Sequence, residues 1–492
     1  MKIKHIRCIT MAFASSLFII AQAATPSLKI TQGKKESTTN AQHTIVATTE
    51  PGNKAFINGK EVHVYTTGAF GDVVTLIEGD NTISITTKNS SNETNTQEIK
   101  ISYKNIRNSS LASKEPATQP KTTPISPALN IKTRPDAYLQ FGDGSDRLGG
   151  TKMGFIDAEI PLKAIGQTSN LYLVQLSRNR VAYIPKEYVA ETLERAETDN
   201  SGSWAINNIG KTDRITISLP SRHAYQSWTQ LDPTTICVDL FGVTNNSNWI
   251  TQRSELGMIE YVDWRQVDCD VLRVIIKLKE KYSWGYSIGY EGNSLVINVK
   301  HCPSLNFKNL TIGLDAGHGG KYPGAIGHTG LKESFVNLDI VQRIKNILEK
   351  KGAKVILSRD SDVDISMSDR KKIFREANVD LMMSVHNNAG GSPLKEMGTS
   401  TYFKHISNRG LAQCVLNRML DLGLRNFGLT GNFNFSLNAP TEYPNLLLEA
   451  LFMSSLPEEE LLADPDYRQR IAEQAVKGIE DYLKLVKQSK KK

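Results

Sequence analysis

The sequence contains few cysteines and no long run of hydrophobic or basic residues. Five of the 492 residues are cysteine, and none occurs in the C-x-x-C spacing that is typical of zinc or redox sites. The charges of both signs are interspersed and sum to only +8, so we expect no nucleic acid partner. Hydrophobic residues make up 39% of the chain, which is enough for sizeable cores and excludes a mainly disordered protein.

Several common catalytic motifs are also missing. The sequence has no H-E-x-x-H, which excludes the zincin class of metalloproteases, and no G-x-S-x-G, which removes the usual support for a serine hydrolase. The GGK at residues 319–321 lacks the upstream glycine and the following Ser or Thr of a phosphate-binding loop. Any catalytic chemistry must therefore come from another arrangement of residues.

The first 23 residues have the pattern of a secretory signal peptide. Three basic residues precede the apolar stretch Cys8–Ile20, and the small-x-small tripeptide AQA follows it. The alternative, a retained membrane anchor, needs ~20 apolar residues, and no later stretch approaches that length. We expect a signal peptide at 1–23, no retained transmembrane segment, and export to the periplasm or cell wall.

Alternation of apolar and polar residues predicts two small β modules in the first 200 residues. In residues 30–106, Asn58-Gly59 lies between two alternating runs and is a strong hairpin signal. The phrases FINGKEVHVY and LIEGDNTISI resemble bacterial Ig-like modules.

Residues 107–128 are rich in Pro, Ser and Thr and predict an extended linker. Residues 129–191, with NLYLVQLSRNRVAYIPKEYV, resemble an SH3-like barrel.

Residues 202–303 predict a third β module. Its strands are DRITISL, TICVDLFGV, VLRVIIKL and NSLVINVK, an order similar to that of the AMIN module. In that family the AMIN module commonly binds the cell wall or localises an amidase.

Of the five cysteines, Cys8 would leave with the signal peptide. The sequence does not choose a pairing among the other four, which are Cys237, Cys269, Cys302 and Cys414.

After residue 307 the pattern changes to short apolar runs separated by helical patterns. The runs cover 311–317, 353–359, 380–386 and 445–452, and they are typical of strands buried on both faces. One helical pattern stops at Gly352, a residue suited to the position after a helix, and further helices are predicted over 368–377, 408–422 and up to about Leu485. The fold class is therefore multidomain: all-β modules, then an α/β domain at 308–487 with a mostly parallel sheet flanked by helices, and a basic tail at 488–492.

Four polar residues stand where ligands collect in such a sheet, beyond the carboxyl ends of strands. His318 follows the first run, His386 ends the third, Glu449 interrupts the last, and Glu333 begins the first long helix. Two histidines and a carboxylate are a recurrent ligand set for catalytic zinc, with the fourth position left for water.

Each of these residues also has a structural explanation. A lone histidine after a strand is more often a hydrogen-bonded loop residue, and Glu333 could be a carboxylate that stabilises the first turn of its helix. Glu449 could pair with a buried arginine such as Arg359 or Arg370. Spacing alone leaves the zinc site and the structural explanations about equally favoured.

A family resemblance changes this balance. The segments LDAGHGGKYPGAIGHTGLKES, MSDRKKIFREANVDLMMSVHNNA and PNLLLEALFMSS occur in the order found in the zinc-dependent N-acetylmuramoyl-L-alanine amidases of the amidase-3 family, which the chain closely resembles. The resemblance implies that His318, Glu333 and His386 are zinc ligands and that Glu449 is the catalytic carboxylate. Asp315, Asn387 and Asn388 would either orient these ligands or have a structural role.

The resemblance implies a peptidoglycan hydrolase that cleaves the amide bond between N-acetylmuramic acid and L-alanine, using zinc-activated water with Glu449 as the general base. Three features depart from the family. Ala316 replaces the common proline, and HNNA replaces the commoner HANA or HADA. Glu449 follows His386 by only 63 positions, which leaves too few residues for the long helix that occludes some cell-division amidases. Two alternatives stay open, a catalytically weak wall-binding scaffold or activator, and a peptidase of stem peptides. Whether a protein activator takes part is also open.

Overall fold

The computed structural model describes residues 24–105, 122–144 and 148–490. The predicted signal peptide and most of the predicted linker lie outside these residues. The chain divides into two compact units, Met1–Asn105 and Ile106–Lys492, and each is described separately.

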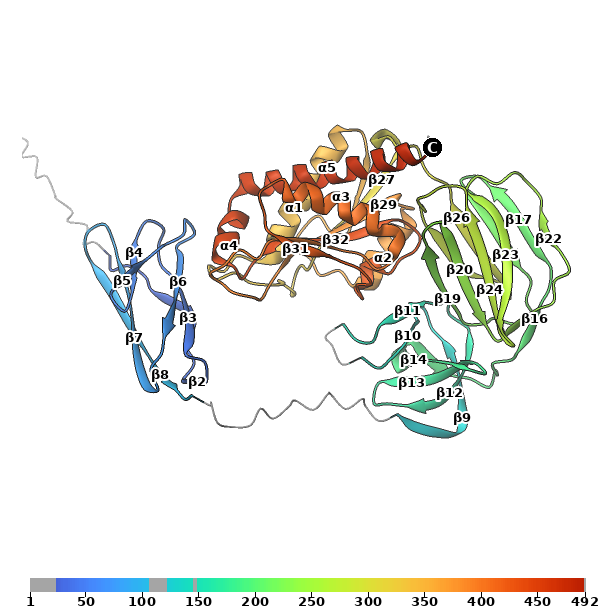
Figure 1. The fold of residues 1–492 in the computed structure, drawn as a ribbon, viewed down its shortest axis with the longest axis horizontal. Helices are drawn as coiled ribbons and strands as arrows, with labels where there is room; N and C mark the ends of the chain where they lie inside the picture. Colours follow the sequence, from blue (N-terminus) through green and yellow to red (C-terminus); the bar gives the residue numbers. More distant parts are fainter. Residues whose placement is uncertain (1–23, 106–121, 145–147, 491–492) are drawn as a thin grey trace, which may run out of the picture. The chain divides into compact units, whose positions relative to one another are not determined.

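The first unit is an all-β sandwich of two sheets (Figure 1). A three-stranded sheet has the order β1-β3-β6, and a five-stranded sheet has the order β2-β8-β7-β4-β5. Asn58 and Gly59 both have positive φ, at 50° and 76°, and connect β4 to β5, so the predicted hairpin is present. The strands are β1 (Lys29–Gln32), β2 (Ser37–Thr38), β3 (Gln42–Thr48), β4 (Lys54–Ile57), β5 (Lys60–Val62), β6 (Ala69–Thr75), β7 (Gly79–Lys88) and β8 (Thr94–Tyr103).

The second unit begins with a seven-stranded antiparallel sheet of order β11-β10-β14-β13-β12-β9-β15. Residues 123–128, which the sequence assigned to the linker, belong to strand β9, where Thr123 pairs with Gln167 and Pro124 with Gly166. The linker boundary was therefore predicted too late, because proline suits an extended chain whether or not that chain is paired. The strands are β9 (Thr123–Thr133), β10 (Tyr138–Gln140), β11 (Lys152–Phe155), β12 (Pro161–Gln167), β13 (Leu171–Ser177), β14 (Arg180–Pro185) and β15 (Val189–Glu191).

The next part of this unit contains a five-stranded sheet of order β22-β17-β18-β26-β25, a four-stranded sheet of order β19-β20-β24-β23, and the short pair β16-β21. Strand β20 is buried along its whole length. The strands are β16 (Asp199–Ser201), β17 (Trp204–Ile209), β18 (Thr212–Ile217), β19 (Tyr225–Gln230), β20 (Thr235–Phe241), β21 (Val243–Asn245), β22 (Ile250–Gln252), β23 (Ile259–Asp268), β24 (Val271–Leu278), β25 (Tyr286–Glu291) and β26 (Ser294–Lys300).

The C-terminal part is an α/β domain around a six-stranded sheet of order β28-β27-β29-β32-β30-β31. The four strands predicted from the apolar runs are mutually parallel neighbours. Strands β30 and β31, which the sequence did not predict, pair with each other in parallel, and β30 lies antiparallel to β32. The strands are β27 (Thr311–Ala316), β28 (Lys354–Leu357), β29 (Leu381–Asn388), β30 (Thr399–Tyr402), β31 (Asn426–Thr430) and β32 (Asn445–Phe452).

The helices of this domain lie close to the predicted positions, except that α4 was not predicted. Helix α1 ends before Gly352, whose φ of +90° suits the residue that follows a helix. Successive residues of a strand point to opposite faces of the sheet, and the neighbours Met382 and Met383 of β29 belong to different core clusters. Both faces of the sheet are therefore covered. Helix α3 packs on β30, β32 and α5, and it is the only α-helix between β29 and β32. The helices are α1 (Glu333–Lys350), α2 (Met367–Glu376), α3 (Arg409–Leu420), α4 (Leu456–Ala463) and α5 (Pro465–Ser489).

The three parts of the second unit share one hydrophobic core. A single cluster of buried side chains includes Ile131, Trp284 and Leu448, one from each part. The four cysteines in the described residues are free thiols. Since residues far apart in sequence bury one another, the three predicted modules pack as one body.

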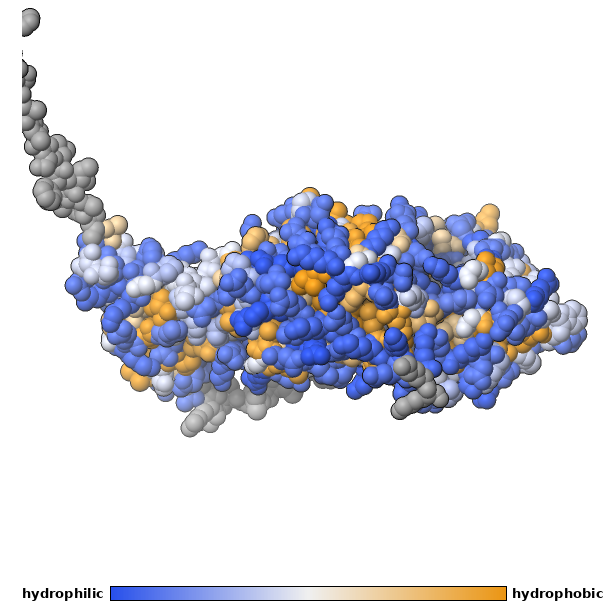
Figure 2. Space-filling view, turned by 90° about the horizontal axis from the view of Figure 1, so that it is seen from above, coloured by the Kyte–Doolittle hydropathy of each residue, from blue (hydrophilic) through white to orange (hydrophobic). Residues whose placement is uncertain are grey.

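The face of the molecule shown in Figure 2 is mostly hydrophilic, with hydrophobic residues in separate patches. None of the described helices combines the length and the apolar composition that crossing a membrane requires.

Candidate functional site

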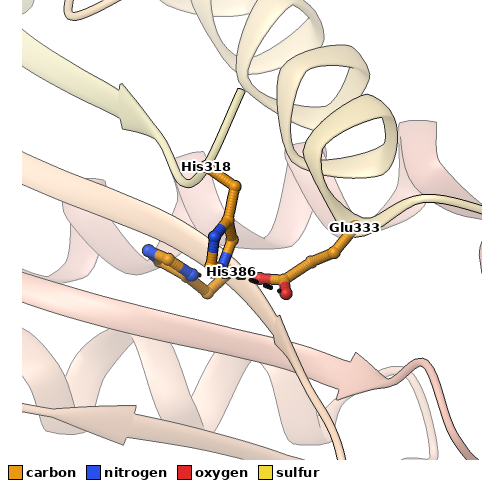
Figure 3. A group of neighbouring side chains, drawn as sticks. All are labelled: His318, Glu333 and His386. Carbon is orange, nitrogen blue, oxygen red and sulfur yellow. Dashed lines mark hydrogen bonds and ion pairs between the residues drawn. The ribbon is translucent and has the colours of Figure 1, made fainter. Parts of the chain in front are cut away.

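Three different elements bring His318, Glu333 and His386 together (Figure 3). His318 lies just beyond β27, Glu333 is the first residue of α1, and His386 is near the end of β29. Strands β27 and β29 are parallel neighbours, so their carboxyl ends meet at the same edge of the sheet. One potential ligand atom from each residue lies within 4.8 Å of those of the other two.

Glu333 is the centre of this group. Its Oε2 is 3.2 Å from Nε2 of His318, and its Oε1 is 3.0 Å from Nδ1 of His386. The two imidazole rings meet edge to face, with centroids 4.9 Å apart. Two nitrogen atoms and one carboxylate therefore converge on a small volume.

Glycines make this convergence possible. A Cβ on Gly317 would lie 2.3 Å from Cε1 of His386, and a Cβ on Gly324 would lie 2.4 Å from Oε2 of Glu333. His318 itself has a φ of 64°, a conformation that costs free energy in a residue with a side chain. The loop between β27 and α1 thus accepts backbone strain in order to bring His318 to the carboxylate.

The electrostatics of the site favour a charged Glu333. Burial alone would raise the pKa of Glu333, but hydrogen bonding to His318 and His386 holds the pKa of this carboxyl well below its usual range. Burial by itself would lower the pKa of His386, whereas its contact with Glu333 raises the pKa above the ordinary value. Nε2 of His386 is buried and makes no hydrogen bond within the described residues, so the site has capacity for a further polar group.

Side-chain amides hold Glu333 and the loop around it. Asn337 donates to Oε1 of Glu333 and to the Gly317 carbonyl, each at 3.2 Å, and Asn387 donates through its side chain to Asn337 at 2.8 Å. The backbone N–H groups of Ala325 and Asn387 also donate to Glu333. Asn337 was missed from the sequence, although its position four residues after Glu333 places both on one face of α1.

Two buried arginines, Arg359 and Arg370, hold the end of β27 and the loop that follows it. Arg370 pairs with Asp315 at 2.6 Å and donates to the His318 carbonyl at 2.7 Å. Arg359 donates to the carbonyls of Ala316 and Gly317, both at 2.9 Å. Asp315 therefore belongs to the support of the His318 loop, together with both arginines.

Glu449 lies on β32, directly across from His386 on the neighbouring strand β29. Paired residues of adjacent strands project from the same sheet face, so both side chains belong to one face. Glu449 is half-buried between fully buried neighbours. Its negative charge contributes to the raised pKa of His386, which indicates that the two groups are close.

Another buried carboxylate, missed from the sequence, organises the approach to Glu333. Glu459 on α4 is fully buried and accepts hydrogen bonds from the N–H groups of His328 and Thr329, at 3.0 and 2.9 Å. It thereby anchors the loop that precedes α1. Its sequence context is an ordinary helix with several acidic residues, which gave no signal for this role.

A second group of potential metal-ligand atoms in the described residues has a different explanation. Asp268, Cys269 and Asp270 lie at the turn between β23 and β24. Asp270 accepts a hydrogen bond from the N–H of Arg178 at 2.7 Å, and Asp268 accepts one from the Asn179 side chain at 3.0 Å. These carboxylates join two parts of the second unit.

Comparison with known families gives two matches. Residues 312–481 match the family model described as N-acetylmuramoyl-L-alanine amidase, and residues 205–299 match the AMIN domain. The first match covers the six-stranded sheet and the four polar residues above, and the second covers most of β17 to β26.

Individual relatives match the same C-terminal region. A germination-specific N-acetylmuramoyl-L-alanine amidase of Bacillus subtilis is 30% identical over 198 residues, which cover 37% of this chain and 82% of the relative. The endolysin of Bacillus phage SPP1 is 36% identical over 185 residues, covering 36% of this chain and 67% of the endolysin. The amidase AmiC of Neisseria meningitidis is 27% identical over 224 residues, and the chain spans about half of it, 54%.

Among solved structures, the amidase AmiC2 of Nostoc punctiforme is 31% identical and is covered over 99% of its length, against 36% of this chain, with a TM-score of 0.34. The catalytic domain of CwlV from Bacillus (Paenibacillus) polymyxa is 29% identical and is covered over 98% of its length, against 36% of this chain, with a TM-score of 0.34.

Proposed function

The chain belongs to the N-acetylmuramoyl-L-alanine amidase family, enzymes that cleave the amide bond between N-acetylmuramic acid and L-alanine in peptidoglycan, and from that premise we propose how its own residues carry out this hydrolysis. The observation that carries the proposal is the convergence of His318, Glu333 and His386, whose ligand atoms lie within 4.8 Å of one another.

We propose that these three residues hold a zinc ion. Two imidazole nitrogens and one carboxylate oxygen match the donors of catalytic zinc sites. Ligand atoms at ~2.1 Å from an ion in a tetrahedral arrangement are ~3.4 Å apart. The contacts from Glu333 to His318 and to His386, at 3.2 and 3.0 Å, are close to that spacing. When bound, zinc lowers the pKa of a water molecule to ~7 and polarises the carbonyl of the substrate.

Glu449 is the general base in this proposal. Its place opposite His386 on the adjacent strand puts a carboxylate on the same sheet face as the proposed ligand. It accepts the proton of the attacking water and returns that proton to the nitrogen of L-alanine as the amide bond breaks. Glu333 keeps its negative charge and holds both imidazole rings in place throughout.

We further propose that the chain acts outside the cytoplasm, in the periplasm or the cell wall. The basic and apolar pattern of residues 1–23 and the match of residues 205–299 to the AMIN domain support this location. Peptidoglycan is then the macromolecular partner of the β modules as well as the substrate of the site.

The test is digestion of purified peptidoglycan by the chain from residue 24 onward, with the released products identified by mass. We expect stem peptides with L-alanine at their amino terminus. Glu449→Gln keeps the size of the side chain and removes the base, so it should slow the reaction ~10²- to 10⁴-fold while zinc content is unchanged. A chelator should abolish the activity of the wild type.

Three outcomes separate the alternatives. Cleavage within the stem peptide would show that the substrate bond is wrong. Zinc bound without any cleavage would favour the scaffold, and recovery of activity on addition of a cell-envelope extract would instead identify a required protein activator. A wild-type rate in Glu449→Gln would remove that residue from the mechanism.

A further inference from the structure

A loop next to the candidate metal site is held by a different part of the chain. The loop at residues 431–435 lies between β31 and the short 3₁₀ turn η4 (Ser436–Asn438). One of its residues, Phe435, packs against His386, and the residue before it, Asn434, bonds to the segment that leads into β11 of the seven-stranded sheet. The loop thus connects the SH3-like part of the chain, residues 129–191, to a proposed zinc ligand.

Asn434 uses its whole side chain for this connection. Its Nδ2 donates to the carbonyls of Leu148 and Gly150, at 3.0 and 2.8 Å, and its Oδ1 accepts from the N–H of Lys152 at 3.1 Å. Three hydrogen bonds of the correct polarity require a side chain with both a donor and an acceptor at one end. Asparagine supplies two N–H donors and an acceptor oxygen, whereas the hydroxyl of a serine or threonine has only one donor.

Two lysines fix the same interface around Asn434. Lys404 is 9% exposed, and its Nζ donates to the Lys152 carbonyl at 3.1 Å. Burial at this position lowers the pKa of Lys404 to about 8. Lys371 on α2 pairs with Asp136 at 3.1 Å and lies 4.1 Å from the ring centroid of Phe155. The SH3-like part is therefore docked on the α/β domain at several points.

The other end of the loop touches the site. The rings of Phe435 and His386 meet edge to face, with centroids 5.7 Å apart and an interplanar angle of 88°. Phe433 packs on Tyr402 of β30, with centroids 4.6 Å apart. Asn434 stands between these two phenylalanines, so its position sets where both rings can lie.

We propose that Asn434 is a positioning residue, through which the SH3-like part of the chain holds Phe435 against His386 and so keeps that histidine in its ligand orientation. This inference rests on the proposed function, because it takes His386 to be a zinc ligand. It gives residues 129–191 a role in catalysis in addition to any binding of the cell wall.

The experiment compares Asn434→Ala and Asn434→Asp with Asn179→Ala in the chain from residue 24 onward. Asn179 is an exposed asparagine whose side chain joins the same SH3-like part to the β23–β24 turn, away from the site, so it is a matched control. Four quantities are measured: the Kd for Zn²⁺ by competition with a chromogenic chelator, kcat and KM on a soluble muropeptide, and the Tm.

We expect Asn434→Ala to raise the Kd for Zn²⁺ and to lower kcat, each by ~10-fold, which is the lower end of the effects seen when groups behind metal ligands are removed. KM should change little, because Asn434 does not touch the substrate in this proposal. Asn434→Asp should behave like the alanine variant, since a carboxylate cannot donate to the two carbonyls. Asn179→Ala should leave the Kd and kcat at wild-type values even where its Tm falls as far.

Two results would overturn the inference. One is a wild-type Kd and kcat in Asn434→Ala together with a lowered Tm, which is what a merely structural contact would give. The other is a wild-type Kd and kcat in Asn434→Asp, which would show that donation by the amide is irrelevant. Failure of the proposed function is seen separately. A wild-type chain that binds Zn²⁺ but releases no stem peptide, even with a cell-envelope extract added, would refute the amidase mechanism, while the Kd would still decide the role of Asn434.

Discussion

Among the described residues, two buried carboxylates, Asp213 and Glu333, each lie beside a histidine ring, yet Glu333 alone of this pair has the surroundings of a metal site. Asp213 on β18 is 0% exposed, and Glu333 on α1 is 4% exposed. Asp213 accepts hydrogen bonds from the N–H groups of Gly257, Met258 and Ile259, at 2.9, 2.6 and 2.8 Å, and lies 2.8 Å from Nε2 of His301. Glu333 faces two imidazoles instead of one.

The difference lies in what surrounds each carboxylate. Around Asp213 the partners are mostly backbone N–H groups, which neutralise a negative charge and offer no lone pair to a cation. Around Glu333 two imidazole nitrogens and the carboxylate converge from three separate elements. A buried carboxylate beside a histidine therefore does not by itself indicate a metal site. The feature that indicates metal chemistry is the convergence of lone pairs from several elements.

The largest effect that this comparison predicts is for removal of the central carboxylate. Glu333→Ala should lose bound zinc on dialysis and lose hydrolysis by more than the 10- to 100-fold that second-layer changes cost, because it removes one of three ligands. Metal content and the rate of stem-peptide release are the measurements. Retention of one zinc per chain would contradict the proposed ligand set.

Asp213→Ala should lower the stability of the folded chain and leave zinc binding unchanged. It leaves several buried N–H groups without a partner, so the free energy of unfolding of this part should fall by about 3–5 kcal/mol. All five tryptophans lie between residues 204 and 284, so tryptophan fluorescence during urea unfolding reports on this region alone. Zinc affinity of the folded variant should equal that of the wild type, and a large loss of affinity would break the comparison.

A smaller effect is expected one layer behind the ligands. Asn337→Ala removes hydrogen bonds to both Glu333 and the Gly317 carbonyl, so the Kd for Zn²⁺ should rise by about 10- to 100-fold. Asn387 would lose its partner as well. The control is Asn298→Ala on β26, whose side chain bonds to Ser287 away from the site and whose loss should leave the Kd unchanged.

The smallest effect concerns the pH dependence of stability. Burial would raise the pKa of Asp213, but the backbone N–H groups and His301 lower it below the ordinary value of 3.8. A carboxyl whose pKa is lower in the folded state stabilises the protein fully above its unfolded pKa, and this contribution is lost as the pH falls through the folded value. The difference in unfolding free energy between wild type and Asp213→Asn should therefore be constant from pH 5 to 7 and should shrink below pH 4. A constant difference down to the acid transition would contradict the shift.

Much of the catalytic domain could be predicted from the sequence. The four apolar runs became the four parallel strands, and the start of α1 lies at Glu333 as its motif implied. Strands β30 and β31 were missed because they are short and partly polar, and such segments carry little periodicity. The site residues His318, Glu333, His386 and Glu449 were found from motifs, and their roles stay predictions until metal and product are measured.

The surroundings of the site were less predictable. Asn337 could have been found from its helical spacing to Glu333, but Glu459 and Asn434 stand in sequences that resemble any acidic helix or polar loop. The expectation of separate modules also differs from the shared core of residues 122–490, because a strand pattern shows that a face is buried and does not show what buries it.

The sequence by itself determined the strands of the catalytic sheet, the glycine-rich approach to His318 and the identities of the donor residues, since these depend on local periodicity and on residue chemistry. Only the tertiary structure decided that Arg370 pairs with Asp315, and that Asn434 bonds to Lys152. The residues of these two contacts are 55 and 282 positions apart, and the contacts depend on the packing of whole sheets, which no local pattern encodes.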